Sequence, residues 1–160
     1  MLNLRSAFVA AFGLALLASS ARAQSGADIL AGVRALDCTF PVATTVTWKN
    51  DVPEPRVRSG ATLALKVSDI EVSESSGKVV NGNGSESEVT VQVYGWNLHV
   101  LDSSRSGRLA VTSVFAQKVN GEKFKAVHTR TDYLPIDLPG FKSEPEVTQF
   151  FGDCAVTVAK

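Results

Sequence analysis

The pair Asn120-Gly121 joins two runs of alternating polar and apolar residues. Asn and Gly tolerate the positive φ angles that both central positions of a type I′ hairpin turn require. The pair therefore predicts a two-residue turn between strands at about 108–119 and 122–133. With a third run that starts at Val89, these strands form a β-meander, so the predicted fold class is all-β and antiparallel.

A two-residue turn would also fix the register of the hairpin, because opposite residues can be counted outward from it. The predicted pairs, which share one face, are Val119 with Glu122, Gln117 with Phe124, Phe115 with Ala126, Ser113 with His128, and Val111 with Arg130. Leu109 lies on the same face, whereas the opposite face is rich in lysine, so we expect the first face to line the core. His128 and Arg130 then point inward. A bulge at Tyr94-Gly95 would add Trp96 to this row.

The predicted core face thus gathers the candidate ligand-binding residues Trp96, Ser113, His128 and Arg130. An unpaired buried guanidinium is costly, so Arg130 needs an anionic partner. In a structural interpretation, His128 is a core residue and the partner of Arg130 is one of three carboxylates, Glu122, Asp132 or Glu146. In a functional interpretation, the four residues line a cavity for a small, partly apolar, anionic molecule.

Two other kinds of site are disfavoured. A triad of Ser113, His128 and Asp132 fails on distance, because four residues of strand separate the histidine from the aspartate by about 13 Å. The only two histidines, His99 and His128, are expected on opposite faces, so we predict no metal site and no cofactor. No catalytic residue can be assigned, and the sequence leaves open whether the protein is an enzyme.

Residues 1–23 have the features of a secretory signal peptide. Arg5 precedes an apolar segment at 7–18, and Ala21-Arg22-Ala23 forms an A-x-A cleavage site before Gln24. The apolar segment is too short to remain as a membrane-spanning helix. We therefore expect a periplasmic or extracellular protein that is not inserted in the membrane after cleavage.

The remaining residues, 24–160, have the length of a single domain with its own core. Without the two arginines of the leader they carry 16 − 2 = 14 basic and 16 acidic residues, a formal charge of −2, so a nucleic-acid partner is not expected. Cys38 and Cys154 lack C-x-x-C spacing, and in an exported chain they predict one disulfide, worth about 3 to 5 kcal/mol. Such a bond would make the first and last strands neighbours and close the sheet into a barrel or sandwich.

Other patterns predict the rest of the architecture. The expected elements are a short helix at 24–36, strands at about 38–48 and 61–72, and a proline-rich turn or extended loop at 51–56. Residues 146–151 and 153–158 are expected to form the last strand or a broken pair of strands. A change of phase near Ser68-Asp69 predicts another bulge, and repeated bulges favour a coiled barrel over a flat sandwich. We predict a closed antiparallel barrel of seven or eight strands, calycin-like in architecture, with a short N-terminal helix.

Three segments resemble a group of small uncharacterised secreted bacterial proteins: Cys38-Thr-Phe40, FKAVHTR at 124–130 and QFFGDC at 149–154. The resemblance implies export and paired cysteines, and no activity is known for the group. Similarity to the lipocalins is architectural only, because Val46-Thr47-Trp48 stands where their first strand carries Gly-x-Trp.

Three classes of function agree with these features. A binding module for a small ligand or a protein partner needs only a cavity or a surface. A barrel enzyme, of the isomerase, cyclase or hydrolase kind, would use His128 as a general base. A structural protein of the cell envelope would need an exposed apolar patch. We favour the binding module, and the sequence does not define the ligand or the oligomeric state.

Overall fold

The computed structural model describes residues 25–81, 83–103, 107–119, 121–133 and 143–159. The predicted signal peptide and its cleavage site before Gln24 lie outside these ranges, as does Asn120 of the predicted turn.

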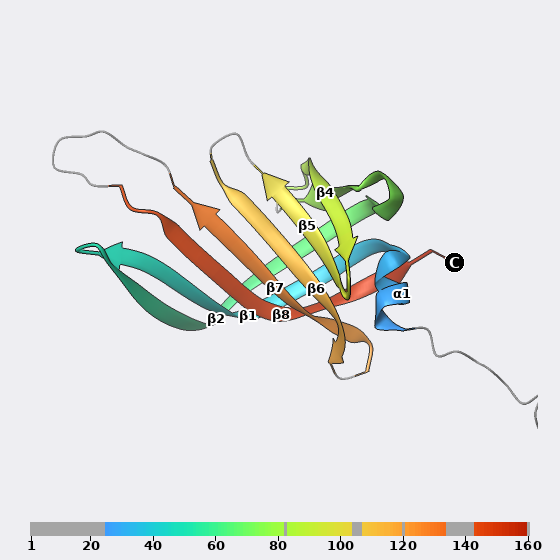
Figure 1. Cartoon of the computed structure of the whole chain (residues 1–160), viewed down its shortest axis with the longest axis horizontal. Helices are drawn as coiled ribbons and strands as arrows, with labels where there is room; N and C mark the ends of the chain where they lie inside the picture. Colours follow the sequence, from blue (N-terminus) through green and yellow to red (C-terminus); the bar gives the residue numbers. More distant parts are fainter. Residues whose placement is uncertain (1–24, 82, 104–106, 120, 134–142, 160) are drawn as a thin grey trace, which may run out of the picture.

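Eight antiparallel strands follow one another around a closed barrel (Figure 1). Each strand pairs with the next in the chain, and β1 also pairs with β8. The elements are α1 (Gly26–Ala31), β1 (Val33–Lys49), β2 (Val52–Glu71), the 3₁₀ turn η2 (Val72–Glu74), β3 (Ser76–Val80), β4 (Glu86–Tyr94), β5 (Asn97–Ser103), β6 (Leu109–Val119), β7 (Lys123–Asp132) and β8 (Glu146–Val158). The predicted all-β closed antiparallel barrel with one short helix is confirmed.

The helix is shorter than the sequence predicted. Ser25 begins it with a capping box, in which its side chain accepts from the Asp28 N–H at 3.2 Å and the Asp28 carboxylate accepts from the Ser25 N–H at 3.2 Å. Gly32 ends it by donating its N–H to Ile29 O. The predicted span 24–36 is therefore wrong at its C-terminal end, where the chain already belongs to β1. Val33 and Leu36 have a spacing that is also found on helices, but both are buried on β1. Packing in the barrel therefore decides the conformation of this segment.

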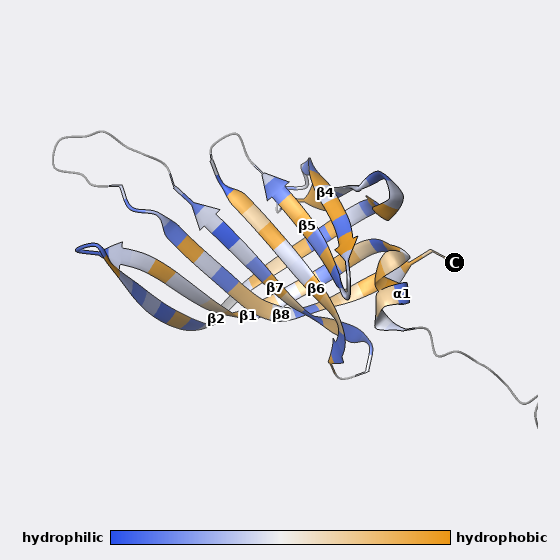
Figure 2. Ribbon diagram, viewed as in Figure 1, coloured by the Kyte–Doolittle hydropathy of each residue, from blue (hydrophilic) through white to orange (hydrophobic). Residues whose placement is uncertain are grey.

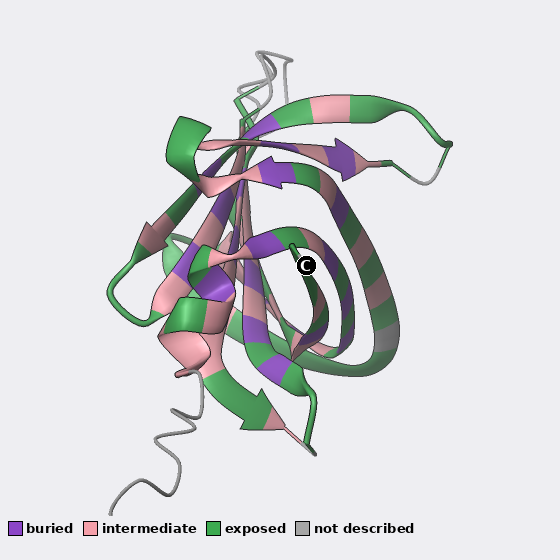
Figure 3. Ribbon diagram, turned by 90° about the vertical axis from the view of Figure 1, so that its right-hand side faces the viewer, coloured by how far each residue is buried: buried purple, intermediate pink, exposed green. Residues whose placement is uncertain are grey.

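The end of the barrel beside α1 is filled by an apolar core. Polar and apolar residues alternate along the strands, and the apolar ones are denser toward α1 (Figure 2). Seen from that end, buried and exposed segments alternate around the ring of strands (Figure 3). The largest fully buried side chains include Leu30, Phe40, Ile70, Leu98 and Phe124.

A disulfide joins the first and last strands within this core. Cys38 and Cys154 are directly opposite each other in the β1–β8 ladder, are fully buried, and are bonded across 116 residues of sequence. The predicted pairing is confirmed, and so is the expectation that the terminal strands are neighbours.

Beyond the barrel, β1 and β2 continue as a projecting hairpin (Figure 1). The prediction of a turn or extended loop at 51–56 is wrong, because β2 already begins at Val52 and both Pro53 and Pro55 are paired with β1. β3 pairs with β2 only from Lys66 to Glu71, so the other edge of the first half of β2 has no neighbour among the described strands. Proline is compatible with such an edge, where it donates no hydrogen bond and hinders pairing with another chain.

The run from Val89 to Val100 is two strands and not one bulged strand. Tyr94 pairs with Asn97, so Gly95 and Trp96 are the two residues of a hairpin turn, and Gly95 has a φ of +58°. The change of apolar phase was correctly detected but was assigned to the wrong cause. By contrast, the predicted irregularity near Ser68-Asp69 is confirmed by a register shift between Ser68 and Glu71.

The register between β6 and β7 also differs from the prediction. Val119 pairs with Lys123 and not with Glu122, so the loop has three residues, and a bulge between Val114 and Lys118 shifts the register again. All five predicted pairs are therefore wrong. On β7 the inward face was predicted correctly, whereas β6 is turned over: Ala110, Thr112 and Val114 are buried, while Val111, Ser113 and Phe115 are on the other face and Leu109 is 41% exposed.

Candidate functional site

A cavity of about 220 Å³ lies at the mouth of the barrel, at the end away from α1. One wall comes from β2 and β3 and is mainly apolar, with Leu63, Leu65, Val79 and Val80 among its residues. The opposite wall comes from β5, β6 and β7 and carries charged and polar residues, namely Asp102, Arg108, His128 and Arg130. We call this space the mouth cavity.

The mouth is polar because the inward side chains change character along the barrel. On β7, Phe124 and Ala126 are buried near the core, and the next two inward positions are His128 and Arg130. β1 and β8 change in the same direction, and their buried residues Thr45 and Thr148 are hydrogen-bonded through their hydroxyls at 3.1 Å. The Thr148 hydroxyl also donates to Glu146 Oε1 at 3.2 Å, so the buried hydroxyls of this polar layer are satisfied within the protein.

His128 is held in one orientation at the boundary between core and mouth. Its side chain is 8% exposed, and Nδ1 lies 2.8 Å from Thr112 Oγ1 on β6. The rings of Phe40 and Phe150 flank it, with centroids 5.9 and 5.8 Å from the imidazole. Burial lowers the pKa of His128, and the positive charge of Arg130 lowers it further, while Asp102 acts in the opposite direction. With its pKa lowered below the ordinary value of about 6.5, the imidazole is mainly neutral at pH 7.

Arg130 has one ion-pair partner among the described residues, and that partner is shared. Its Nε lies 3.2 Å from Asp132 Oδ2, but the two groups are not aligned as a hydrogen bond, and Nε is buried. Asp132 Oδ1 accepts a 2.7 Å hydrogen bond from Arg108 Nε. Of the three carboxylates that the structural interpretation offered, Asp132 is the one that Arg130 meets. Both side chains of this pair are about one-third exposed, so the pair contributes under about 1 kcal/mol to stability.

The structure does not bring all four predicted residues together. His128 and Arg130 line the mouth cavity, but Trp96 is 67% exposed in the β4–β5 turn. Ser113 faces outward, where its hydroxyl lies 2.9 Å from His99 Nδ1. The reversed face of β6 explains the error for Ser113, and the hairpin at Gly95-Trp96 explains it for Trp96.

Sequence reasoning missed Thr112, Asp102 and Arg108. Thr112 is one residue from the predicted Ser113, and the correct register would have identified it. Asp102 continues the inward alternation of Leu98 and Val100 on β5. Arg108 shares the parity of Ala110 and Thr112, so the reversed face of β6 hid it as it hid Thr112.

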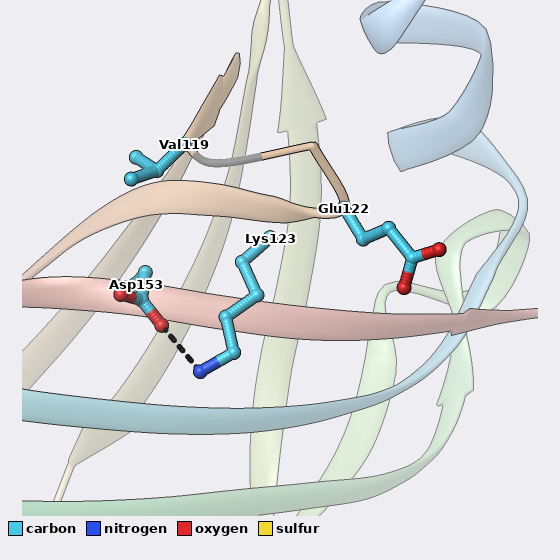
Figure 4. Close-up of a pocket in the computed structure, with 4 residues that line it drawn as sticks. All are labelled: Val119, Glu122, Lys123 and Asp153. Atoms are coloured by element: carbon cyan, nitrogen blue, oxygen red, sulfur yellow. Dashed lines mark ion pairs between the residues drawn. The ribbon is translucent and has the colours of Figure 1, made fainter.

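Two other hollows lie on the outer surface. One, which we call the outer groove, is lined by Phe115, Gln117, Lys125, Val127 and Phe151, among others, where β6 bulges. The second lies beside the β6–β7 loop and is drawn in Figure 4, where Lys123 and Asp153 point toward each other and Glu122 points away. Its main feature is the ion pair between Lys123 Nζ and Asp153 Oδ1 at 3.0 Å. Asp153 Oδ1 is buried and makes no hydrogen bond, but this ion pair compensates its charge within the protein.

No cluster of three or more histidine, cysteine, aspartate or glutamate side chains capable of holding a metal occurs among the residues that the structure describes. In the same residues, no helix has the length and apolar character needed to cross a membrane. No protein-family model matches the chain, and no curated protein matches it either. The mouth cavity is therefore the feature of the protein that bears most on its function.

Proposed function

We propose that the protein is an exported binding module whose mouth cavity holds a small, partly apolar anion. The proposal is supported by the position of Arg130, whose guanidinium lines a partly open cavity and whose one carboxylate partner in the described structure also binds Arg108. Arginine has five N–H donors in a planar fork, and a single poorly aligned contact with Asp132 uses few of them. A ligand carboxylate would meet the remaining donors in the bidentate geometry that this pair favours.

The other wall of the cavity indicates the rest of the ligand. Leu63, Leu65, Val79 and Val80 offer an apolar surface opposite the arginine. A cavity of about 220 Å³ is smaller than the pockets that hold drug-sized molecules. A short aliphatic acid or a single-ring aromatic acid has the required size, with its carboxylate toward Arg130 and its apolar part toward β2 and β3.

Export is supported by two features. The first 23 residues have the pattern of a signal peptide, and the Cys38–Cys154 bond is of a kind that persists in oxidising compartments. A barrel that folds after export would meet its ligand in the periplasm or outside the cell.

Isothermal titration with hexanoate and benzoate tests the binding proposal. Hexanol and benzyl alcohol, which match the two acids in size but carry no charge, should bind at least tenfold more weakly, since they lose the charge-assisted hydrogen bonds. Arg130→Gln should weaken acid binding by a similar factor and lower the stability by under about 1 kcal/mol. The matched control is Arg34→Gln, which removes another half-exposed arginine, one that is paired with Glu71 outside the mouth cavity.

Two results would count against the proposal. One is the absence of a binding heat with either acid in the wild type, and the other is binding of both acids to Arg130→Gln with wild-type affinity. A stability loss of about 3 kcal/mol or more in Arg130→Gln, with acid binding unchanged, would make Arg130 a structural residue whose removal orphans a buried partner.

A barrel enzyme is the second candidate, and one observation favours it. His128 presents a neutral imidazole that Thr112 orients, which is the state a general base needs. A screen of ester and enolisable ketone substrates with the wild type and His128→Gln tests this. Turnover that disappears in the variant would establish catalysis, and turnover that persists would assign the activity to another residue or to a contaminant.

A further inference from the structure

The two basic side chains of the mouth cavity occupy successive inward positions on one strand. His128 and Arg130 both line the cavity, and residues two apart on a strand are separated by about 7 Å. A carboxylate is wide enough to contact groups on both sides of it. An anion held by the guanidinium of Arg130 therefore lies next to the imidazole of His128.

The imidazole has one nitrogen for the protein and one for a ligand. Nδ1 is engaged by the Thr112 hydroxyl at 2.8 Å. Nε2 has no hydrogen-bond partner among the described residues. It is not one of the fully buried atoms without a partner, so it retains some accessible surface. Because His128 lines the mouth cavity, Nε2 is the nitrogen that a bound molecule can reach.

Thr112 is suited to both protonation states of the imidazole. A hydroxyl group donates a hydrogen bond to a neutral ring nitrogen and accepts one from an imidazolium N–H. The contact at Nδ1 is therefore kept when the ring gains a proton. A lysine in place of Thr112 would disfavour protonation of the imidazole, and a carboxylate there would favour it even without a ligand.

The charges that face His128 come from several elements. Arg130 on β7 and Arg108 before β6 are positive, while Asp102 on β5 and, further out, Asp132 on β7 and Glu146 on β8 are negative. β1 contributes Phe40, Ala43 and Thr45 and no charge, and β2 places the exposed Arg58 opposite Ala43. The nearest charge on the strand of His128 is Arg130. Its positive charge disfavours protonation of His128 unless an anion lies between the two side chains.

We propose that His128 is the second anchor of the ligand and takes up one proton from solvent when the anion binds, so that the site binds a carboxylate together with H⁺. This inference rests on the proposed function. In the complex, the imidazolium donates one N–H to Thr112 Oγ1 and the other to a carboxylate oxygen, and Arg130 donates to the same carboxylate. The ligand class is then a monocarboxylate, whose single negative charge lies between two cationic groups.

The direction of the pH dependence follows from the free protein. Burial and Arg130 keep the pKa of His128 below its ordinary value when no anion is present, and a bound carboxylate raises it. Between these two values, binding takes up a proton, so affinity rises as the pH falls, by at most about tenfold per pH unit for one proton. Carboxylic acids with a pKa near that of a glutamate side chain, about 4.3, stay ionised over this range.

Titration calorimetry with benzoate at pH 6 and pH 8, in pairs of buffers with different ionisation enthalpies, measures both quantities. The wild type should bind benzoate at least about fivefold more tightly at pH 6 than at pH 8. Each binding event should take up between zero and one proton on average. His128→Gln should bind with no pH dependence and no proton uptake. His99→Gln, which changes the outward histidine, is the matched control and should behave as the wild type.

The outcomes separate the two proposals. Equal wild-type affinity at both pH values, with no proton exchanged, overturns the coupling and leaves the binding function intact. Absence of benzoate and hexanoate binding at either pH overturns both. Should His128→Gln fail to fold, the pKa of His128 in the wild type can be followed by NMR with and without benzoate. A rise on binding supports the coupling, and an unchanged pKa contradicts it.

Discussion

Reduction of the Cys38–Cys154 bond should destabilise the protein by about 5 kcal/mol without changing the barrel. The bond joins residues 116 apart, and the loss of loop entropy from an unfolded chain cross-linked at that separation corresponds to about 5 kcal/mol at 25 °C. In the folded state the two sulfurs are fully buried at directly paired positions of β1 and β8, so two thiols fill nearly the same space. The ladder between the strands remains, and the effect falls mainly on the unfolded state.

Urea denaturation of the oxidised and the reduced protein, followed by circular dichroism, measures this difference. The midpoint should fall, and the slope of the free energy with urea should rise, because the reduced unfolded chain exposes more surface. Since a domain of this kind has about 5 to 15 kcal/mol in total, the reduced form should be marginal. A loss under about 1 kcal/mol, or an unchanged slope, would refute the entropic account. Free thiols in unreduced material would refute the bond itself.

Three further predictions concern packing and pH. Gly152→Ala should destabilise by more than about 3 kcal/mol, since its Cβ would lie 1.9 Å from Thr39 O, whereas Gly32→Ala, with a φ of −97° and 3.7 Å of clearance, should be tolerated in the same thermal melts. Thr112→Val should cost about 1 to 3 kcal/mol by leaving Nδ1 of His128 unpaired, which urea titration will show. Because the pKa of His128 is lowered in the folded state, unfolding melts should show stability decreasing as the pH falls below about 6.5, and less so in His128→Gln.

Much of the fold could be predicted because it depends on local alternation and on the two cysteines. Inward positions on β7, from Phe124 to Arg130, alternate strictly and were assigned to the correct face. The position of Cys154 near the C-terminus, far from Cys38, was enough to close the sheet. These signals survive because each depends on a short segment or on a covalent bond.

Register could not be predicted, because it depends on how many residues a turn and a bulge absorb. The Asn-Gly signal placed a hairpin correctly, but the loop took in Glu122 and the bulge at 115–117 set three residues against Lys125. A one-residue change reverses a strand face, so Ser113 was exchanged for Thr112 in the candidate site. His128 and Arg130 were retained because they lie on the strand whose face was assigned correctly.

The length of the projecting hairpin was not predicted correctly. Two prolines at Pro53 and Pro55 indicated a turn, yet an edge strand accommodates them because one side of it has no partner to receive a hydrogen bond. That part of β2 is an edge because β3 has only five residues and does not reach it, and the sequence pattern did not indicate how short β3 is.

A crystal structure of the protein with benzoate would show whether the mouth cavity is the ligand site. We expect the carboxylate in the mouth cavity, within hydrogen-bond distance of the guanidinium of Arg130 and of His128 Nε2, with the aromatic ring against Leu63 and Leu65. Benzoate bound instead in the outer groove, beside Phe115 and Phe151, with the mouth cavity empty, would contradict it.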